Sequence, residues 1–527
     1  MPRTRNAERK PLSFSTTMRN PDRIGAHLSV LLPFEGMILT NNIIIKIIKS
    51  LFKNKIITSN YQKSIARYKN ILTSEELTFT DNDLNDLIQN SADGLNQKHK
   101  EYGFDRGWPS RFATRYSFPQ ELGFIRYEIG KPLEISKTGH MLIDAYKENS
   151  INGQKIQNIM LNALMKYQTN NPFRKNANSN APLPLLLNVL DLFKKDKKEN
   201  GAGVSRQELS IFICWRDNNA NALYEYIKDL RKRVGFNCSD EYIYERCLEI
   251  LGADDSQRNR FKMNQICGEA VDEYIRKMRS TGIISLRGNV RFIDFNKIEE
   301  EKIQYVIDNY SEYPTFTDKF QYYEYMGSID NNILEIKQSS QIDLTDVRKQ
   351  ALYRYAKEYS QEKIFEELHK VCNKKNSTDN ILKFINAPTR LEFLTSIALV
   401  QQFEGLDVNP NYSVDDEGLP TYTAGGGIAD IECFDSKYNS YFEVTLMCGR
   451  QDQVNNEIVP IRRHLREALQ KNPLSFSVFV APVIHEDTVE VANLYKIREN
   501  LDILTFSIND FIKNIKQKQK VRELLYD

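Results

Sequence analysis

Two short runs in the C-terminal third of the chain constrain its fold most strongly. Apolar and polar residues alternate from Ile428 to Phe434 and again from Tyr441 to Met447, with a turn-like segment, Asp435 to Ser440, between them. This alternation predicts a β-hairpin with one buried face. Because side chains alternate along a strand and the two arms pair, Asp430 and Glu443 are expected to lie within reach of one cation.

The two acids predict a metal site. Carboxylates held close together repel each other unless a proton or a metal ion lies between them. Hard divalent ions such as Mg²⁺ prefer oxygen ligands and usually keep water and substrate phosphate oxygens in their shell. We therefore expect Asp430 and Glu443 to bind Mg²⁺ for the hydrolysis of a phosphodiester bond.

The composition is that of a multidomain protein with ordinary cores and an uneven distribution of charge. Its 527 residues, 41% of them hydrophobic, suffice for roughly three or four domains. The net charge is only +2, yet residues 1 to 23 contain six bases against two acids, and residues 36 to 74 contain seven bases against none. This asymmetry favours a polyanionic partner, although a solvated helix face and a loose tail fit the charge equally well.

Cysteine usage and hydropathy bear on the compartment. The seven cysteines are odd in number and show no CxxC spacing, which predicts reduced thiols in a cytoplasm, without a zinc knuckle or a disulfide framework. No signal peptide is visible, and the most apolar early run, Ile43 to Phe52, is interrupted by Lys46 and Lys49. We expect an amphipathic helix there and no membrane association.

Residues 1 to 150 are predicted to form a winged-helix-like DNA-recognition domain. A helical pattern near 75–90 is followed by a loop rich in Gly, Pro and Arg (Gly103 to Tyr116), a hairpin over Gly123 to Ile135, and a helix over Ser136 to Tyr146. Helices followed by a small hairpin and a further helix are typical of winged helices, in which one helix enters a DNA groove. Winged helices also serve as protein-contact modules, and that alternative stays open.

Six arginines of this domain are candidates for DNA contacts. A guanidinium group on a long side chain can reach phosphates and guanine edges. The candidates are Arg19, Arg23, Arg106, Arg111, Arg115 and Arg126.

A second winged-helix-like domain is predicted over residues 151 to 300. Ser205 and Glu208 have the S-x-x-E spacing of a capping box, and Ile283 to Ile293 has the pattern of a hairpin. The basic triplet Arg231 to Arg233 ends a predicted helix. It fits either a phosphate contact or the favourable effect of cations at a helix C-terminus, and the sequence does not choose between them.

The rest of the chain divides into a helical linker, 301–375, and an α/β domain, 376–527. The boundary lies in a polar segment, Asn373 to Asn380, that has the composition of a linker. In the α/β domain we expect, besides the hairpin, helices near 389–403, 455–470 and 488–497, strands at Ser475–Ala481 and Asp502–Ser507, and a closing helix from Asn509.

This order resembles the PD-(D/E)xK nuclease core, whose signature is an acid on one strand and acid-x-Lys on the next. Asp430 and Glu443-Val444-Thr445 match it, except that Thr445 occupies the lysine position. The expected fold is therefore multidomain α+β. It has N-terminal winged-helix-like DNA-recognition domains, a helical linker and a C-terminal α/β PD-(D/E)xK nuclease core.

Several motifs carry a more specific resemblance. The segments IADIE, FEVT, an acid shortly before PIRRH, and FVAP are similar to those of the AlwI family of type IIS restriction endonucleases. The N-terminal RNPDRI and LLPFEG also resemble the opening of that family, while the middle matches only in its helical character. Members of the family likewise carry Thr in place of the superfamily lysine, and they include site-specific nicking enzymes.

The resemblance implies a set of site residues. It places the family's acids at Glu392, Asp430, Glu443 and Glu457, and its Arg-His pair at Arg463 and His464. The spacing from Glu443 to Glu457 is slightly longer than the family pattern. With the lysine absent, Arg450, Gln453 and Arg463 are candidates to stabilise charge in the transition state.

Three of these residues also have structural interpretations. Glu392 follows Thr389 as T-x-x-E, which is a capping box, and a carboxylate can cap a helix and still bind a metal. Glu457 lies near a helix start, where an acid is favourable for the helix dipole alone. His464 fits a general base, a phosphate contact or helix packing.

The resemblance implies a function. It predicts an enzyme that binds a short asymmetric site in double-stranded DNA, of the GGATC or GAGTC sort, and cuts at a fixed distance outside it with Mg²⁺. One catalytic site cuts one strand, so double-strand cleavage implies dimerisation through the nuclease domain. A cognate DNA methyltransferase and a prokaryotic cytoplasm are implied as well. The alternatives are a strand-specific nicking enzyme, a winged-helix DNA-binding regulator with an inactive nuclease-like domain, and a repair nuclease that reads DNA structure.

Overall fold

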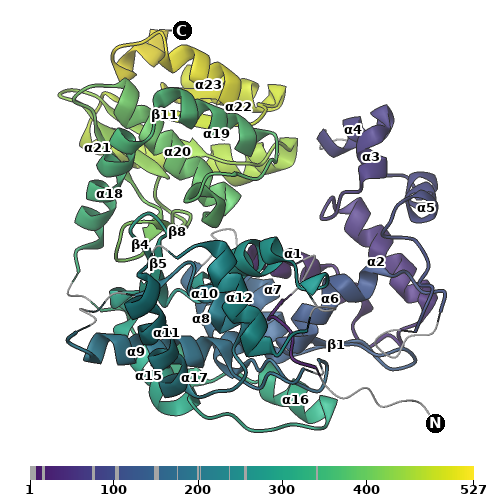
Figure 1. Cartoon of the computed structure of the whole chain (residues 1–527). Helices are drawn as coiled ribbons and strands as arrows, with labels where there is room; N and C mark the ends of the chain where they lie inside the picture. The colour runs from purple at the N-terminus through teal and green to yellow at the C-terminus, as the bar shows by residue number, and fades with distance from the viewer. Residues whose placement is uncertain are drawn as a thin grey trace. The chain divides into compact units, whose positions relative to one another are not determined.

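The chain forms two compact units, each assembled from more than one stretch of sequence (Figure 1). One unit comprises Met1–Ile65, Phe79–Tyr146 and Gln154–Ser339, and the other comprises Ala66–Thr78, Lys147–Gly153 and Ser340–Asp527. The computed structural model describes residues 8–14, 18–73, 77–100, 106–147, 153–174, 176–198, 201, 203–236, 238–254, 258–339 and 342–526. The predicted four-part division, 1–150, 151–300, 301–375 and 376–527, is finer than this two-way division and stays a prediction.

Helices dominate the chain before residue 340, and together with the short sheets they make the fold a mixed α+β one. The α-helices of this part are α1 (Ile24–Ser29), α2 (Asn41–Lys53), α3 (Asn60–Ser64), α4 (Ala66–Thr73), α5 (Asp81–Asn90), α6 (Arg111–Glu121), α7 (Lys137–Lys147), α8 (Gly153–Lys166), α9 (Pro182–Lys195), α10 (Leu209–Cys214), α11 (Ala220–Val234), α12 (Asp240–Leu251), α14 (Ala270–Arg279), α15 (Glu300–Tyr310), α16 (Lys319–Gly327) and α17 (Asn331–Glu335). The 3₁₀-helices are η1 (Pro21–Arg23), η2 (Leu32–Phe34) and η4 (Lys297–Glu299), and η3 (Asn264–Glu269) is a π-helix.

Two small antiparallel sheets accompany these helices. The strands are β1 (Ile125–Arg126), β2 (Glu134–Ile135), β3 (Val204–Ser205), β4 (Ile284–Arg287) and β5 (Phe292–Phe295). β1 pairs with β2, and the other three form a sheet in the order β3-β5-β4. The two predicted hairpins are therefore present. The winged-helix interpretation of these regions stays a prediction.

Local sequence signals account for several of these elements. α2 begins after Thr40, whose side chain accepts a hydrogen bond from the Ile43 amide at 3.3 Å, as expected for an N-cap. The reciprocal hydrogen bonds of the predicted capping box are present, because the Ser205 amide donates to Glu208 Oε2 at 2.7 Å and the Glu208 amide donates to Ser205 Oγ at 3.3 Å. They close the turn before α10 and do not cap it, since α10 begins at Leu209 with Glu208 as its N-cap. Two predictions need correction. The helix expected over 75–90 begins at Asp81, with 74–76 outside the described residues.

The second correction concerns the loop predicted over Gly103 to Tyr116. Residues 103–105 lie outside the described residues, and α6 begins at Arg111, so the loop prediction is wrong from there on. Phe112 and Tyr116 are fully buried and pack on each other with ring centroids 5.0 Å apart. Burial of these large side chains outweighs the weak local preference for a loop.

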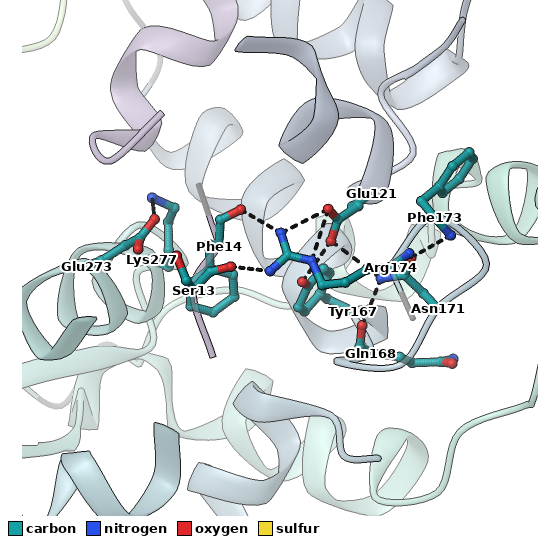
Figure 2. A network of polar contacts seen from close by, with 10 residues as sticks. All are labelled: Ser13, Phe14, Glu121, Tyr167, Gln168, Asn171, Phe173, Arg174, Glu273 and Lys277. Carbon is teal, nitrogen blue, oxygen red and sulfur yellow. Dashed lines mark hydrogen bonds and ion pairs between the residues drawn. The ribbon is translucent and has the colours of Figure 1, made fainter. Parts of the chain in front are cut away.

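A polar network centred on Arg174 fastens the N-terminal segment in the first unit (Figure 2). The Arg174 guanidinium donates to Glu121 Oε1 at 3.0 Å and to the Phe14 carbonyl at 2.9 Å, while the Tyr167 hydroxyl donates to Glu121 Oε2 at 2.9 Å. Lys277, fully buried on α14, donates to the carbonyls of Met18 and Arg19 at 2.7 and 2.8 Å. The charges of Arg174, Glu121 and Lys277 are thus each paired or hydrogen-bonded, as burial requires.

The second unit is built on a five-stranded sheet. Its order is β12-β11-β10-β9-β6, with β6, β9 and β10 antiparallel and β10, β11 and β12 parallel. The strands of this unit are β6 (Asp407–Pro410), β7 (Ser413–Val414), β8 (Pro420–Tyr422), β9 (Ile431–Phe434), β10 (Asn439–Val444), β11 (Ser475–Ala481) and β12 (Ile503–Ser507), of which β7 and β8 form a separate pair. The helices are α18 (Leu344–Glu358), α19 (Gln361–Cys372), η5 (Leu382–Phe384), α20 (Ala387–Gln402), the π-helix η6 (Asp452–Ile458), α21 (Val459–Lys471), α22 (Glu486–Glu499), α23 (Ile508–Ile515) and η7 (Val521–Tyr526).

Helices cover both faces of this sheet. Ile461 and Leu465 of α21, and Ala492 of α22, form one buried cluster with Phe479 of β11. Phe442 of β10 points to the other face by the alternation of strand side chains, and its ring lies 6.2 Å from that of Phe511 in α23. β11, an interior strand of the sheet between β12 and β10, is buried along its whole length, as expected for a strand covered on both sides.

The element order predicted for residues 389 to 527 is confirmed, with two corrections. β6, an edge strand that ends at Pro410, and the β7–β8 pair were not predicted. Because Pro donates no hydrogen bond to a sheet, this stretch lacks the usual strand signal. The first hairpin arm begins at Ile431, and Ile428 is 49% exposed, so the buried face is shorter than predicted. No helix in the described part of the chain is both long and apolar enough to cross a membrane.

Candidate active site

The β9–β10 hairpin brings Asp430 and Glu443 together. Ile431 pairs with Phe442 in this antiparallel ladder, so the next residues outward, Asp430 and Glu443, lie opposite each other. The Val444 amide donates a hydrogen bond of 2.7 Å to Asp430 Oδ2, which holds this carboxylate beside the strand that carries Glu443. Glu443 also acts electrostatically on Asp430, so the two acids are neighbours, and their shared binding of one cation stays a prediction.

Burial makes the charged forms of both acids unfavourable. Glu443 is 8% exposed, and burial together with the nearby Glu457 raises its pKa to about 8. Burial and the charge of Glu443 raise the pKa of Asp430 well above its usual range, against the opposing hydrogen bond from Val444. The site therefore has a strong tendency to take up either protons or a cation.

Glu392 reaches the same cluster from α20. Its side chain is 3% exposed, its Oε2 accepts a hydrogen bond from the Ala424 amide at 3.0 Å, and burial and the charge of Asp430 raise its pKa. The capping-box interpretation of Thr389 and Glu392 is wrong. α20 begins at Ala387, and Asn386 is its N-cap, with its side chain accepting from the Thr389 amide at 3.0 Å. The Glu392 carboxylate is thus not used to cap the helix.

Glu457 completes the group of acids from the π-helix η6. Its side chain is half-buried, and burial raises its pKa to about 7 against an opposing hydrogen bond with the Thr445 side chain. Glu457 raises the pKa values of both Asp430 and Glu443, so it lies within electrostatic reach of the pair. Thr445, two residues after Glu443, thus contacts an acid of the cluster.

His464 of α21 borders the cluster. Its Nδ1 lies 3.3 Å from Glu443 Oε1, and burial and the adjacent Arg463 lower its pKa. A neutral imidazole at this position can donate a hydrogen bond to the Glu443 carboxylate or accept one from its protonated form. It can also take up a proton itself.

The acids are the residues that could hold a metal. Among the residues that the structure describes, no group of three or more His, Cys, Asp or Glu side chains is already arranged to hold a metal ion. The donor set is nevertheless made of carboxylate oxygens only, and burial, with the neighbouring acids second, raises their pKa values, a penalty on negative charge that a hard cation would relieve. The side chains present therefore fit Mg²⁺ by their chemistry.

Comparison with known proteins decides the family. The family model described as "AlwI restriction endonuclease" matches residues 120–360 and 331–513, which is most of the chain. The chain belongs to the AlwI restriction endonuclease family. It is accordingly a restriction endonuclease, a site-specific deoxyribonuclease. No curated protein sequence matches it.

Three solved structures are similar to this AlwI-family endonuclease, one over part of the chain and two over almost all of it. The small subunit of the heterodimeric restriction endonuclease R.BspD6I is 21% identical, with 30% of this chain and 77% of that chain covered and a TM-score of 0.25. Restriction endonuclease FokI is 12% identical over 98% of this chain and 97% of its own, with a TM-score of 0.26, and FokI bound to DNA is 12% identical over 99% and 98%, with a TM-score of 0.23. At these TM-scores the superpositions carry no argument, and the family assignment rests on the sequence match.

The candidate DNA-contacting arginines of the AlwI-family chain differ in how they are engaged. Arg115 forms an ion pair with Asp93, and Arg126 donates from Nε to Glu134 at 2.8 Å. Arg19 forms an ion pair with Glu269 at 2.8 Å, and Arg23 donates a hydrogen bond to the Ile56 carbonyl at 2.8 Å. The side chains of Arg106 and Arg111 are exposed. Arg106 and Arg111 have no ion-pair partner among the described residues. The DNA contacts of all six stay predictions.

The structure distinguishes the three residues that were candidates to stabilise charge in place of the absent lysine. Gln453 is fully buried and its amide is bonded only to protein groups, so it is wrongly placed to touch a phosphate. Arg450 is exposed and forms an ion pair with Asp487. Arg463 is exposed, and its Nη2 lies 3.4 Å from the His464 ring beside the acids. No sequence signal distinguished the three, because their difference lies in contacts with distant segments.

Proposed function

We propose that this AlwI-family enzyme is a type IIS restriction endonuclease that cleaves double-stranded DNA at a fixed distance outside a short asymmetric site. The observation that carries the proposal is the placement of Asp430 and Glu443 at the end of the β9–β10 ladder, joined by the Val444–Asp430 hydrogen bond, with Glu392 and Glu457 within electrostatic reach. Family membership supports a recognition sequence of the GGATC or GAGTC sort.

Asp430 and Glu443 are the proposed ligands of Mg²⁺. A divalent cation bound there supplies Lewis-acid stabilisation of charge at the scissile phosphate. Glu392 and Glu457 add negative charge to the site from α20 and η6, and they orient water and the neighbouring carboxylates. This division of labour matches the buried, oxygen-only composition of the cluster.

Arg463 and His464 are proposed to act at the rim of the site. His464 hydrogen-bonds Glu443 and keeps that carboxylate in place, while the exposed Arg463 guanidinium is available to a phosphate of the DNA. Arg463 thereby takes the charge-stabilising role of the absent lysine. Recognition of the sequence is assigned to the residues before about 300, including Arg19, Arg23, Arg106, Arg111, Arg115 and Arg126.

The number of DNA strands that the enzyme cuts, and the protein partners that it needs, follow from the cluster of acids described above. One such site cleaves one strand, so double-strand cleavage requires a second copy, brought in by dimerisation through the nuclease domain. Without that dimer the enzyme is a strand-specific nicking endonuclease. A cognate DNA methyltransferase would protect the host's own sites in the prokaryotic cytoplasm.

Digestion of supercoiled plasmid and of genomic DNA tests the proposal. With Mg²⁺ we expect discrete fragments whose sequenced ends lie at a constant offset from one asymmetric sequence, and no cleavage in excess chelator. Linear plasmid identifies double-strand cutting and open circles identify nicking. Binding without breaks would favour the regulator, and random ends would favour a structure-specific repair nuclease, so either result would overturn the proposal.

A further inference from the structure

Gln453 is a buried side chain near the acids whose four hydrogen bonds all go to other groups. It lies in η6 and its exposed fraction is 0%. Its Nε2 donates to the carbonyls of Met447 at 3.0 Å and Val483 at 2.7 Å. Its Oε1 accepts from the His485 amide and the Thr488 hydroxyl, both at 3.0 Å. All four positions of the primary amide are therefore used.

These four contacts join η6 to two segments, one just before it at Met447 and one about 30 residues later, from Val483 to Thr488. Met447 follows β10, which carries Glu443, and Val483 follows β11. His485 is the N-cap of α22, and Thr488 is a fully buried residue of its first turn. Gln453 thus ties η6 to the ends of two strands and to the start of a helix.

The same π-helix carries Glu457, one turn after Gln453. A π-helix has a poorer hydrogen-bond geometry than an α-helix and occurs mostly as a single turn, frequently at functional sites. The position of Glu457 relative to Asp430 and Glu443 therefore depends on what holds this turn in place. In the described structure the buried contacts of Gln453 hold it at the end nearest β10.

We propose that Gln453 is a positioning residue for catalysis: its amide fixes the π-helical turn so that the Glu457 carboxylate faces the Asp430–Glu443 pair. The inference rests on the proposed active site and adds a residue to it. It also explains why a polar side chain occupies a fully buried position. Replacing the amide by an apolar group would leave two carbonyls, an amide and a hydroxyl without these partners.

A double-mutant cycle separates this role from general packing. Gln453→Met removes all four hydrogen bonds at nearly constant volume, and Glu457→Gln removes the carboxylate that Gln453 is proposed to position. Single-turnover cleavage of a plasmid that the wild-type enzyme cuts is started with Mg²⁺ in the wild type, both single variants and the double variant. Binding to a DNA fragment bearing the mapped site is measured with Ca²⁺ as a test of folding.

The expected result is strong non-additivity. Gln453→Met should slow the wild-type enzyme about 10- to 100-fold, in the range found for residues that orient metal-site ligands, with unchanged DNA binding. In the Glu457→Gln background it should change the rate by no more than about twofold, because the group it positions is already gone. Gln451→Met is the matched control, since it makes the same chemical change at an exposed residue of the same segment, and it should leave the rate unchanged.

A milder pair of variants keeps the inference testable if Gln453→Met does not fold. Thr488→Val removes one of the four hydrogen bonds without changing shape, and Thr488→Ser keeps the hydroxyl. We expect Thr488→Val to slow cleavage about fivefold in the wild type but not in the Glu457→Gln background, and Thr488→Ser to retain the wild-type rate.

Two outcomes overturn different conclusions. If Glu457→Gln slows cleavage but Gln453→Met and Thr488→Val lower the rate by equal factors with and without it, Gln453 acts through packing alone and this inference fails. If Glu457→Gln and Asp430→Asn both cleave at the wild-type rate, the proposed active site itself is wrong.

Discussion

Buried acids occur in both units of the molecule, but their negative charges are compensated in different ways. In the first unit Glu208 is 3% exposed and is held by Arg231, whose Nε and Nη2 donate to its two oxygens at 2.7 and 2.9 Å. In the second unit Glu392, Asp430, Glu443 and Glu457 are gathered together, and none of them forms an ion pair with a Lys or Arg of the described residues. The first arrangement neutralises charge within the protein, and the second leaves it for something else to neutralise.

The difference teaches how to tell a structural acid from a functional one. Glu208 and Arg231 link the segment before α10 to α11, and Arg231 also lies 4.0 Å above the Phe193 ring, so their charges are satisfied by the fold itself. At the hairpin, burial raises the pKa values of Asp430 and Glu443, and the charge of Glu457 raises both further. Crowded buried carboxylates cost stability, and the cation proposed to bind there would offset that cost.

Removing a carboxylate from the hairpin should have the largest effect on activity. Asp430→Asn keeps the shape and the acceptor for the Val444 amide but loses the charge that binds the cation. We expect cleavage to fall by at least about a thousandfold, since metal-ion catalysis contributes several kcal/mol. Plasmid cleavage and binding of the mapped DNA site measure the two effects separately. The matched control is Glu467→Gln on the exposed face of α21, and wild-type cleavage by Asp430→Asn would contradict the comparison.

Breaking the paired acid should instead cost stability. Arg231→Met keeps the packing on Phe193 but leaves Glu208 buried without its partner, and we expect a loss of about 3–5 kcal/mol in the free energy of unfolding. Chemical denaturation measures it. Arg233→Met, which breaks the exposed pair with Asp229, serves as the control and should cost about 0–1 kcal/mol. Equal losses from the two variants would show that burial does not distinguish the pairs.

The pH dependence of stability should reveal the unpaired acids. The pKa of Glu443 is raised from 4.5 to about 8, so the folded state holds this proton more tightly than the unfolded state. Its contribution is therefore fully present below about pH 4.5 and is lost as pH rises towards about 8. In excess chelator at pH 8.5, Glu443→Gln should be more stable than the wild type by on the order of 1 kcal/mol, with no gain at pH 5.

Thermal unfolding at pH 5 and at pH 8.5 measures this change in stability. It is the smallest of the three effects predicted for the Asp430, Arg231 and Glu443 variants. Glu467→Gln should show no pH-dependent difference from the wild type. Adding Mg²⁺ at pH 8.5 should raise the melting temperature of the wild type more than that of Glu443→Gln. A Glu443→Gln variant that loses stability equally at both pH values would place Glu443 among the structural acids.

Sequence patterns alone predicted much of the second unit. β11 was predicted with its observed ends, Ser475 and Ala481, because a short apolar run between turn residues leaves few alternatives. The meeting of Asp430 with Glu443 follows from the period of two residues in a strand and from antiparallel pairing. Both are local rules that operate within about fifteen residues of the chain, so one sequence suffices to apply them.

The tertiary structure decided what depends on distant segments. It brought Glu392 of α20 within electrostatic reach of Asp430, it added β6 at an edge where Pro410 is tolerated, and it buried Gln453 among groups that follow β10 and β11. None of these could be read from neighbouring residues. Gln453, Arg463 and Glu208 are all polar residues, and the sequence does not show their surroundings. Only packing decides that Gln453 is buried, that Glu208 is paired and that Arg463 is exposed.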